Sequence, residues 1–102
     1  MIAFIFAACS FMGEGEPVEP KKGIIGIWQS DANPKITMKY GNDGKGEYNN
    51  DGQPLTFKYN FTDNNTVKTT FPNGKSISYK VKTTERYLWL TDDNGTDRFH
   101  KM

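Results

Sequence analysis

From Ile24 onward, the chain consists of short runs in which apolar and polar residues alternate. Alternation with a period of two is typical of strands that have one buried and one solvated face. Turn residues separate these runs at the spacing of a β meander. The pattern therefore predicts eight strands, near residues 24–30, 35–40, 46–50, 55–61, 66–71, 76–82, 87–91 and 96–101.

Three turn sequences support this division of the chain. Asn42-Asp43-Gly44 and Pro72-Asn73-Gly74 suit three-residue hairpin loops that place glycine in the left-handed conformation. Asn94-Gly95 suits a two-residue type I′ turn. The loop lengths fix which residues face each other across each hairpin.

The resulting register can be checked, because a one-residue slip moves every side chain of a strand to the other face. It pairs Met38 with Tyr48, Val67 with Tyr79, and Leu90 with Phe99, so apolar residues gather on one face. The predicted inner face consists of Ile36, Met38, Tyr40, Tyr48, Leu55, Phe57, Tyr59, Phe61, Val67, Phe71, Ile77, Tyr79, Val81, Leu88, Leu90 and Phe99. The predicted outer face consists of Lys39, Lys58, Asn60, Lys68, Thr70, Ser78, Lys80 and Lys82.

Eight strands with short connections predict an all-β domain over residues 24–102, an antiparallel up-and-down meander closed as a small barrel. Closure removes the exposed sheet edges. The composition agrees, because seven Phe, five Tyr and two Trp suit a pleated, half-buried surface. A chain of 102 residues allows one such domain.

The N-terminal segment has a different character. Residues 1–8, M-I-A-F-I-F-A-A, are apolar but far fewer than the ~20 residues that cross a bilayer. We interpret them as the end of a truncated signal peptide whose basic start lies upstream of Met1. The alternative is a buried N-terminal strand that contains an ordinary buried cysteine.

Phe6-Ala7-Ala8-Cys9 resembles the bacterial lipobox, in which small residues precede a cysteine that is acylated. The resemblance implies that Cys9 carries palmitate-type chains and attaches the protein to a membrane. Residues 9–23 are rich in Gly, Pro and Glu, and we expect them to form a flexible linker. These features predict a lipid-anchored protein of the cell envelope, on the outer membrane.

Gly26-Ile27-Trp28 on the first strand resembles the Gly-x-Trp signature of lipocalin and fatty-acid-binding barrels. The resemblance implies that Gly26 and Trp28 close one end of the barrel, with an arginine of the last strand, here Arg98, over the indole ring. Residues 24–102 are thus similar to the small lipocalin-like (calycin-type) domains of bacterial cell-envelope lipoproteins. Arg98 and Phe99 are adjacent, so the alternation that places Phe99 inside the barrel places Arg98 outside. The alternation and the resemblance therefore give opposite predictions for Arg98.

Charge and residue types exclude several function classes. Residues 21–102 hold all 13 Lys and Arg against nine of the 12 Asp and Glu, which is too weakly basic for a nucleic-acid binder. His100 is the single histidine and Cys9 the single cysteine, so no catalytic triad is expected away from the end of the chain. We expect a protein that is no enzyme and has no cofactor, metal or nucleic-acid partner.

Two functions remain, and the sequence leaves both open. In the first, a monomeric barrel binds a small apolar or amphipathic ligand at its mouth, lined by Tyr40, Tyr48, Phe57 and Tyr59. In the second, the protein is an interaction module, either an inhibitor or an accessory subunit, whose exposed wall consists of Tyr87, Trp89, Arg98 and His100. Aromatic residues and arginine are enriched at binding hot spots.

Overall fold

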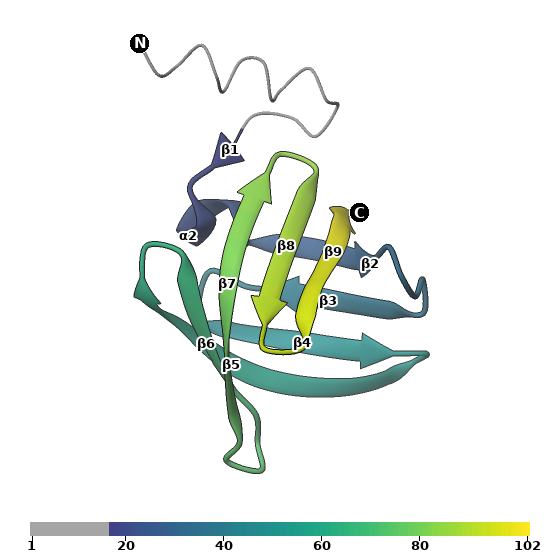
Figure 1. Ribbon diagram of the computed structural model, residues 1–102. Helices are drawn as coiled ribbons and strands as arrows, with labels where there is room; N and C mark the ends of the chain where they lie inside the picture. The colour runs from purple at the N-terminus through teal and green to yellow at the C-terminus, as the bar shows by residue number, and fades with distance from the viewer. Residues whose placement is uncertain (1–16) are drawn as a thin grey trace, which may run out of the picture.

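The computed structural model describes residues 17–102, and Figure 1 shows the arrangement of their strands. Two short elements come first, β1 (Pro17–Val18) and α2 (Pro20–Gly23). Eight longer strands follow and are joined by short connections. They are β2 (Gly26–Ser30), β3 (Ile36–Tyr40), β4 (Lys45–Asn50), β5 (Gln53–Asp63), β6 (Thr66–Thr70), β7 (Ser76–Thr84), β8 (Tyr87–Asp92) and β9 (Gly95–Lys101).

Strands β2 to β9 form a closed antiparallel barrel in which each strand pairs with the next one along the chain. Closure comes from β2 and β9, where Trp28 lies opposite Lys101 and Ser30 lies opposite Phe99. Along β7, the pairing with β6 covers Ser76–Lys80. Strand β1 then occupies the same edge further along β7, opposite Thr83 and Thr84. The predicted fold class, an up-and-down barrel of eight strands, is confirmed.

The predicted register is confirmed in two hairpins. Met38 lies opposite Tyr48, and Val67 lies opposite Tyr79. Both three-residue loops carry glycine at positive φ, +81° at Gly44 and +87° at Gly74. Only glycine takes these angles without steric cost, so the loops hold their strands in the predicted alignment.

The predicted turn at Asn94-Gly95 is wrong by one residue. Asp92 pairs with Gly95, so Asp93 and Asn94 form the loop. An aspartate side chain causes the difference, since Asp92 Oδ1 accepts a hydrogen bond from the Asn94 amide (2.8 Å). The partner of Leu90 is therefore Asp97, and Phe99 faces Leu88 instead. The predicted inner and outer faces are still correct, because the partner of Leu90 shifts by two residues and side chains two residues apart lie on the same face.

One end of the barrel is closed by the segment that leads into β2. Ile24 and Trp28 are completely buried there, and Trp28 Nε1 donates a hydrogen bond to the Ile24 carbonyl (2.9 Å). Helix α2 lies directly before them in the chain, and its Gly23 packs against Thr83 of β7. The linker predicted over residues 9–23 is therefore folded at its C-terminal end, where Pro17–Val18 and Pro20–Gly23 form β1 and α2.

The cation over Trp28 is not Arg98. Lys101 Nζ lies 5.4 Å from the centre of the indole ring, because Lys101 is the residue of β9 directly opposite Trp28. Arg98 lies on the outer face, where its Nε is 2.5 Å from Asp31 Oδ2. Arg98 still connects β9 to the end of β2, since its carbonyl accepts a hydrogen bond from the Asp31 amide (3.0 Å).

Apolar side chains fill the interior as the alternation predicts, with two exceptions at the open end. Leu55 and Ile77 belong to the inner face by register, yet they are 43% and 38% exposed. Within residues 17–102, no helix is long and apolar enough to cross a membrane. The buried apolar core consists of Ile24, Trp28, Met38, Tyr40, Phe57, Val67, Val81, Leu88, Leu90 and Phe99.

Replacing Trp28 by alanine is expected to lower the free energy of unfolding by about 3–5 kcal/mol, because the side chain is fully buried and leaves a cavity. Urea denaturation measures the change. Ile27→Ala is the matched control, since Ile27 is the next residue of β2 but is 46% exposed, and it should cost less than about 1 kcal/mol. Equal losses in the two variants would contradict the role of Trp28 as the closing side chain.

Candidate ligand-binding site

The barrel opens where β5 and β6 separate. Their pairing begins at Lys58 opposite Thr70, and the preceding part of β5, Gln53–Phe57, pairs with β4 alone. The hairpin between β6 and β7 projects beyond the rest of the barrel at this end (Figure 1). Leu55 therefore has a strand neighbour on β4 alone. Ile77 has one on β6 alone, since the pairing of β7 with β8 begins at Lys80. These open sides explain why both residues are exposed.

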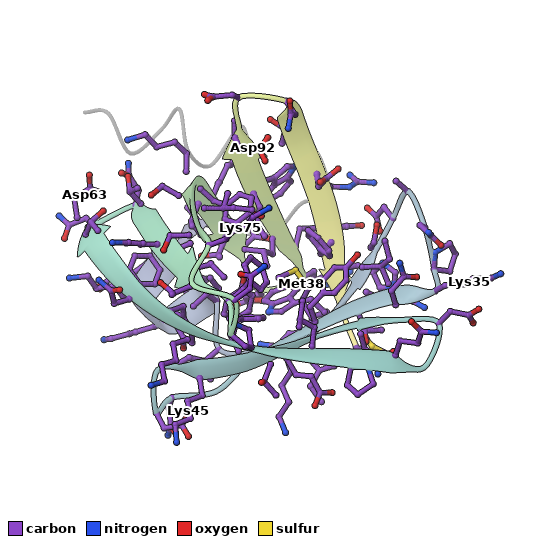
Figure 2. All side chains as sticks on the ribbon, turned by 90° about the horizontal axis from the view of Figure 1, so that it is seen from below. Lys35, Met38, Lys45, Asp63, Lys75 and Asp92 are labelled. Atoms are coloured by element: carbon purple, nitrogen blue, oxygen red, sulfur yellow. The ribbon has the colours of Figure 1, made fainter. Side chains whose placement is uncertain are left out.

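A cavity of about 320 Å³ occupies this end of the barrel, and we call it the mouth cavity. Figure 2 views the molecule from the side toward which the β6–β7 hairpin projects, with Lys75 on that hairpin and Met38 among the interior side chains. Strands β3 to β9 all contribute to the cavity wall. Its lining consists of Met38, Tyr48, Leu55, Thr69, Phe71, Tyr79, Leu90, Asp97 and Phe99.

A second hollow of about 530 Å³ continues from the mouth cavity along the β6–β7 hairpin. Leu55 and Phe71 line both spaces. Pro72 and Ile77 add further apolar surface, and the polar residues on this side are Asn73, Lys75 and Ser76. The apolar lining of the mouth thus extends onto the outer part of the hairpin, where it is accessible to solvent.

Two buried hydroxyl groups have no hydrogen-bond partner among residues 17–102, those of Tyr40 and Thr69. Such groups are costly, because an unpaired buried donor or acceptor loses its hydration without compensation. Tyr40 is enclosed by the core, and this burial raises the pKa of its phenol. Thr69 is also fully buried, and it is one of the residues that line the mouth cavity.

The structure places one of the four predicted lining residues, Tyr48, at the mouth cavity. The other three are not in the lining of this cavity. Tyr40, Phe57 and Tyr59 form a cluster of edge-to-face rings with centroids 4.9–6.4 Å apart. The Tyr59 hydroxyl donates to the Gly41 carbonyl. The cluster lies toward the closed end, where Tyr40 pairs with Gly26 of β2.

Gly46 makes room for this aromatic cluster. It lies directly opposite Phe57, and a Cβ atom at Gly46 would clash with the phenyl ring. The ring therefore covers the backbone of β4 at this position. The ring thus packs directly on the glycine backbone, which a residue with a Cβ atom would prevent.

The four residues predicted to form an exposed wall do come together on the outside of β8 and β9, and we call them the outer wall. Tyr87 lies opposite His100, and Trp89 lies opposite Arg98. The rings of Tyr87 and Trp89 have centroids 5.7 Å apart. Cations cover both rings, since Arg98 Cζ lies 4.7 Å from the Tyr87 ring and Lys82 Nζ lies 4.7 Å from the Trp89 ring.

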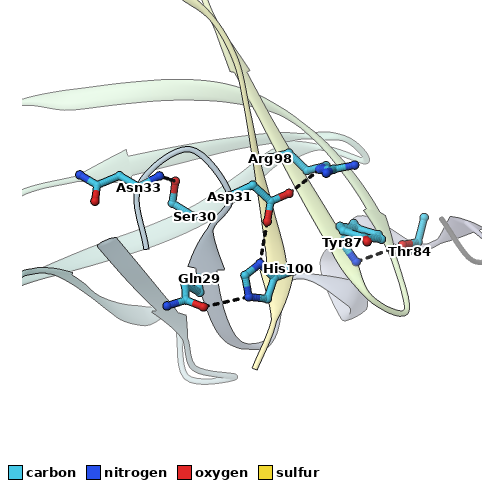
Figure 3. A network of polar contacts seen from close by, with 8 residues as sticks. All are labelled: Gln29, Ser30, Asp31, Asn33, Thr84, Tyr87, Arg98 and His100. Carbon is cyan, nitrogen blue, oxygen red and sulfur yellow. Dashed lines mark hydrogen bonds and ion pairs between the residues drawn. The ribbon is translucent and has the colours of Figure 1, made fainter. Parts of the chain in front are cut away.

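Asp31, in the loop after β2, connects two residues of the outer wall (Figure 3). Its carboxylate binds Arg98 at 2.5 Å and His100 Nδ1 at 2.6 Å. The hydrogen bond from His100, together with Arg98, lowers the pKa of Asp31 below its usual value. The network joins the last strand of the barrel to the end of the first.

Both ring nitrogens of His100 face oxygen acceptors. Gln29 Nε2 donates to the Pro34 carbonyl (2.8 Å), which leaves Gln29 Oε1 at 2.9 Å from His100 Nε2. The carboxylate of Asp31 faces Nδ1. A ring with a proton on each nitrogen donates to both oxygens. The imidazole of His100 and the Nε of Arg98 thus have their partners within the molecule.

Asp97 and Thr69 of the mouth cavity, and Pro72 of the hollow along the hairpin, were not predicted from the sequence. Asp97 alternates with Phe99 on β9, so the parity rule already places it inside. However, Asp97 ends a run of turn-forming residues, Asp92 to Asp97, and such a run is typical of a turn rather than of an inner face. No pattern in the sequence identifies Pro72 as a lining residue, because it lines the hollow only where the β6–β7 hairpin projects from the barrel.

Comparisons with known proteins add no relative. No protein-family model matches the chain, and neither the curated proteins nor the solved structures contain a significant match. Among residues 17–102, no three His, Cys, Asp or Glu side chains are grouped so as to hold a metal ion. Cys9 and the predicted signal peptide at residues 1–8 lie outside the described residues.

Asp31 should make folding stability depend on pH. Its pKa in the folded protein lies below the value near 3.8 expected for the unfolded chain, so its contacts stabilise the fold above that pH. The contribution is lost as the pH falls through the folded pKa. We expect Asp31→Asn to cost about 0.5–1 kcal/mol at pH 7, the scale of a partly exposed ion pair, and clearly less at pH 3.

Urea denaturation of both proteins at the two pH values measures this difference. Asp93→Asn is the control, because Asp93 lies in the exposed β8–β9 loop and forms no ion pair with the described residues. A cost for Asp31→Asn that does not change between pH 7 and pH 3 would contradict the ionic role of Asp31.

Proposed function

We propose that this protein binds a small apolar or amphipathic molecule in the mouth cavity and carries out no catalysis. The observation that carries the proposal is a cavity at the open end of a closed barrel, continuous with exposed apolar side chains. Soluble domains rarely leave apolar residues clustered at an opening unless that surface is used. Leu55, Phe71 and Ile77 form such a cluster.

The volume of the cavity limits the ligand. At about 320 Å³ it is near the lower end of the ~300–1,000 Å³ range of small-molecule sites. A compact molecule or one end of a longer chain would fit inside. The rest of a longer ligand would lie in the hollow along the hairpin, against Pro72 and Ile77. Burial of apolar surface supplies about 25 cal/mol per Å², so such a ligand gains affinity mainly from its apolar part.

We further propose that the protein is a monomeric lipoprotein of the cell envelope, attached through acylated Cys9 at the outer membrane. The lipobox-like Phe6-Ala7-Ala8-Cys9 supports this proposal. The closed barrel and the buried Trp28 of Gly26-Ile27-Trp28 are compatible with a lipocalin-like domain. More than one acyl chain is needed for stable attachment, which is what lipobox processing provides.

Protein interaction through the outer wall is the alternative, and one observation favours it. The adjacent rings of Tyr87 and Trp89 are half-buried on the outside of the barrel, where they serve no part of the core. Lys82 and Arg98, however, already cover these rings, and a partner would have to displace them. Ligand binding at the mouth therefore has the stronger support.

A test uses two isoleucines with similar exposure. Ile77→Thr should weaken binding of an apolar fluorescent probe such as N-phenyl-1-naphthylamine about three- to tenfold, because it places a hydroxyl in the apolar mouth. Ile27→Thr makes the same chemical change on the outer face of β2 and should leave the affinity unchanged. Fluorescence titration measures both. Equal losses of probe affinity in the two variants, or no binding of the probe to the unchanged protein, would contradict the proposal.

Replacing Trp89 by alanine separates the two candidate functions. If the mouth is the site, Trp89→Ala should bind the probe with the affinity of the unchanged protein, since Trp89 lies on the outer face opposite Arg98. A loss of probe binding comparable to that of Ile77→Thr would instead place the ligand at the outer wall. The same fluorescence titration serves as the measurement.

A further inference from the structure

The mouth cavity carries a negative charge. Asp97 is the one charged residue in its lining, and it lies on the inner face of β9 opposite Leu90. Asp92 belongs to the same face of β8, two residues beyond Leu90, at the same end of the barrel. Neither carboxylate forms an ion pair with the described residues. Asp97 is exposed to solvent at the cavity, and a carboxylate without an ion-pair partner there attracts a cationic group of the ligand.

The charges of these two carboxylates also act on Tyr79, another residue of the cavity lining. Burial raises the pKa of Tyr79, and the charges of Asp92 and Asp97 raise it further. Both carboxylates therefore act on the space that the Tyr79 side chain occupies. Lys75, the nearby cation, lines the hollow along the hairpin and is not part of the mouth cavity.

Aromatic rings surround the same space. Tyr48, Phe71, Tyr79 and Phe99 line the cavity together with Asp97. The face of an aromatic ring attracts ammonium groups, and several rings with a carboxylate form the usual site for an organic cation. An anionic ligand would instead meet both the negative ring faces and the carboxylate.

Thr69 supplies an independent observation that points to a ligand. Its side chain is completely buried and lines the cavity, and its hydroxyl has no hydrogen-bond partner among the described residues. The hydroxyl oxygen can accept a hydrogen bond from an N–H group. A buried acceptor that is unpaired in the free protein would gain a partner from an ammonium N–H group that reached it.

We propose that the mouth cavity selects amphipathic amines, molecules with an ammonium group attached to an apolar body. The inference rests on the proposed function and adds the sign of the ligand's charge. The ammonium group lies among the aromatic rings and Asp97, and the apolar body lies against Leu55 and Ile77 at the opening.

Three probes of the same carbon-chain length but different charge test the inference: octylammonium, octanol and octanoate. Each is titrated into the protein below its critical micelle concentration, and binding is followed by amide NMR shifts. Octylammonium should bind about tenfold more tightly than octanol, and octanoate should bind most weakly. Asp97→Asn should reduce the octylammonium affinity to that of octanol and leave octanol unchanged. Asp93→Asn, in the exposed loop of the same hairpin, should affect neither.

The outcomes distinguish the inference from the function on which it rests. Equal binding of octylammonium and octanol, or stronger binding of octanoate, would overturn the charge selectivity and leave the mouth as an apolar site. An octylammonium affinity that Asp97→Asn does not change would overturn it as well. If none of the three probes shifts residues of the mouth, both proposals fail. The comparison of the probes in the unchanged protein does not depend on any variant.

Discussion

Three residues of β2 pair with three residues of β9, and this ladder turns an eight-stranded meander into a barrel. It joins residues from opposite ends of the domain, such as Trp28 and Lys101, so its formation carries the entropic cost of closing a long loop. On the outer side, Asp31 reinforces it through Arg98 and His100. The mouth cavity depends on it too, because the cavity is lined from β3 through β9 and would lie open if the sheet unrolled.

The alternation of apolar residues was enough to predict the strands, their order and the face on which each side chain lies. The loops at Gly44 and Gly74 added the register, because their backbone angles leave few other choices. Neither signal determines the height of a residue along the barrel axis. Tyr40 and Tyr48 share the inner face, yet one belongs to the core near Gly26 and the other to the mouth cavity. Strand tilt decides between these positions, and it depends on the closed barrel as a whole.

Charged side chains were the other source of error, for two different reasons. Arg98 lies on the outer face because it alternates with Phe99, as parity requires, whereas the resemblance placed it inside. Its partner there, Asp31, comes from a loop that the alternation does not describe. Asp97 was predictable from parity, but a carboxylate beside a turn is ordinarily explained by turn chemistry. In this barrel the turn moved by one residue, so the partner of Leu90 is Asp97 rather than Phe99.

The N-terminal segment enters the barrel at the end opposite the mouth, since β1 and α2 lie beside Thr83 and Ile24. Cys9 is eight residues before Pro17, and a fully extended chain of that length reaches at most about 28 Å. A protein anchored at Cys9 would therefore keep its closed end near the lipid and turn its opening outward. In that orientation the opening would face the aqueous space, which would favour exchange of small molecules with that space over extraction of lipids from the membrane.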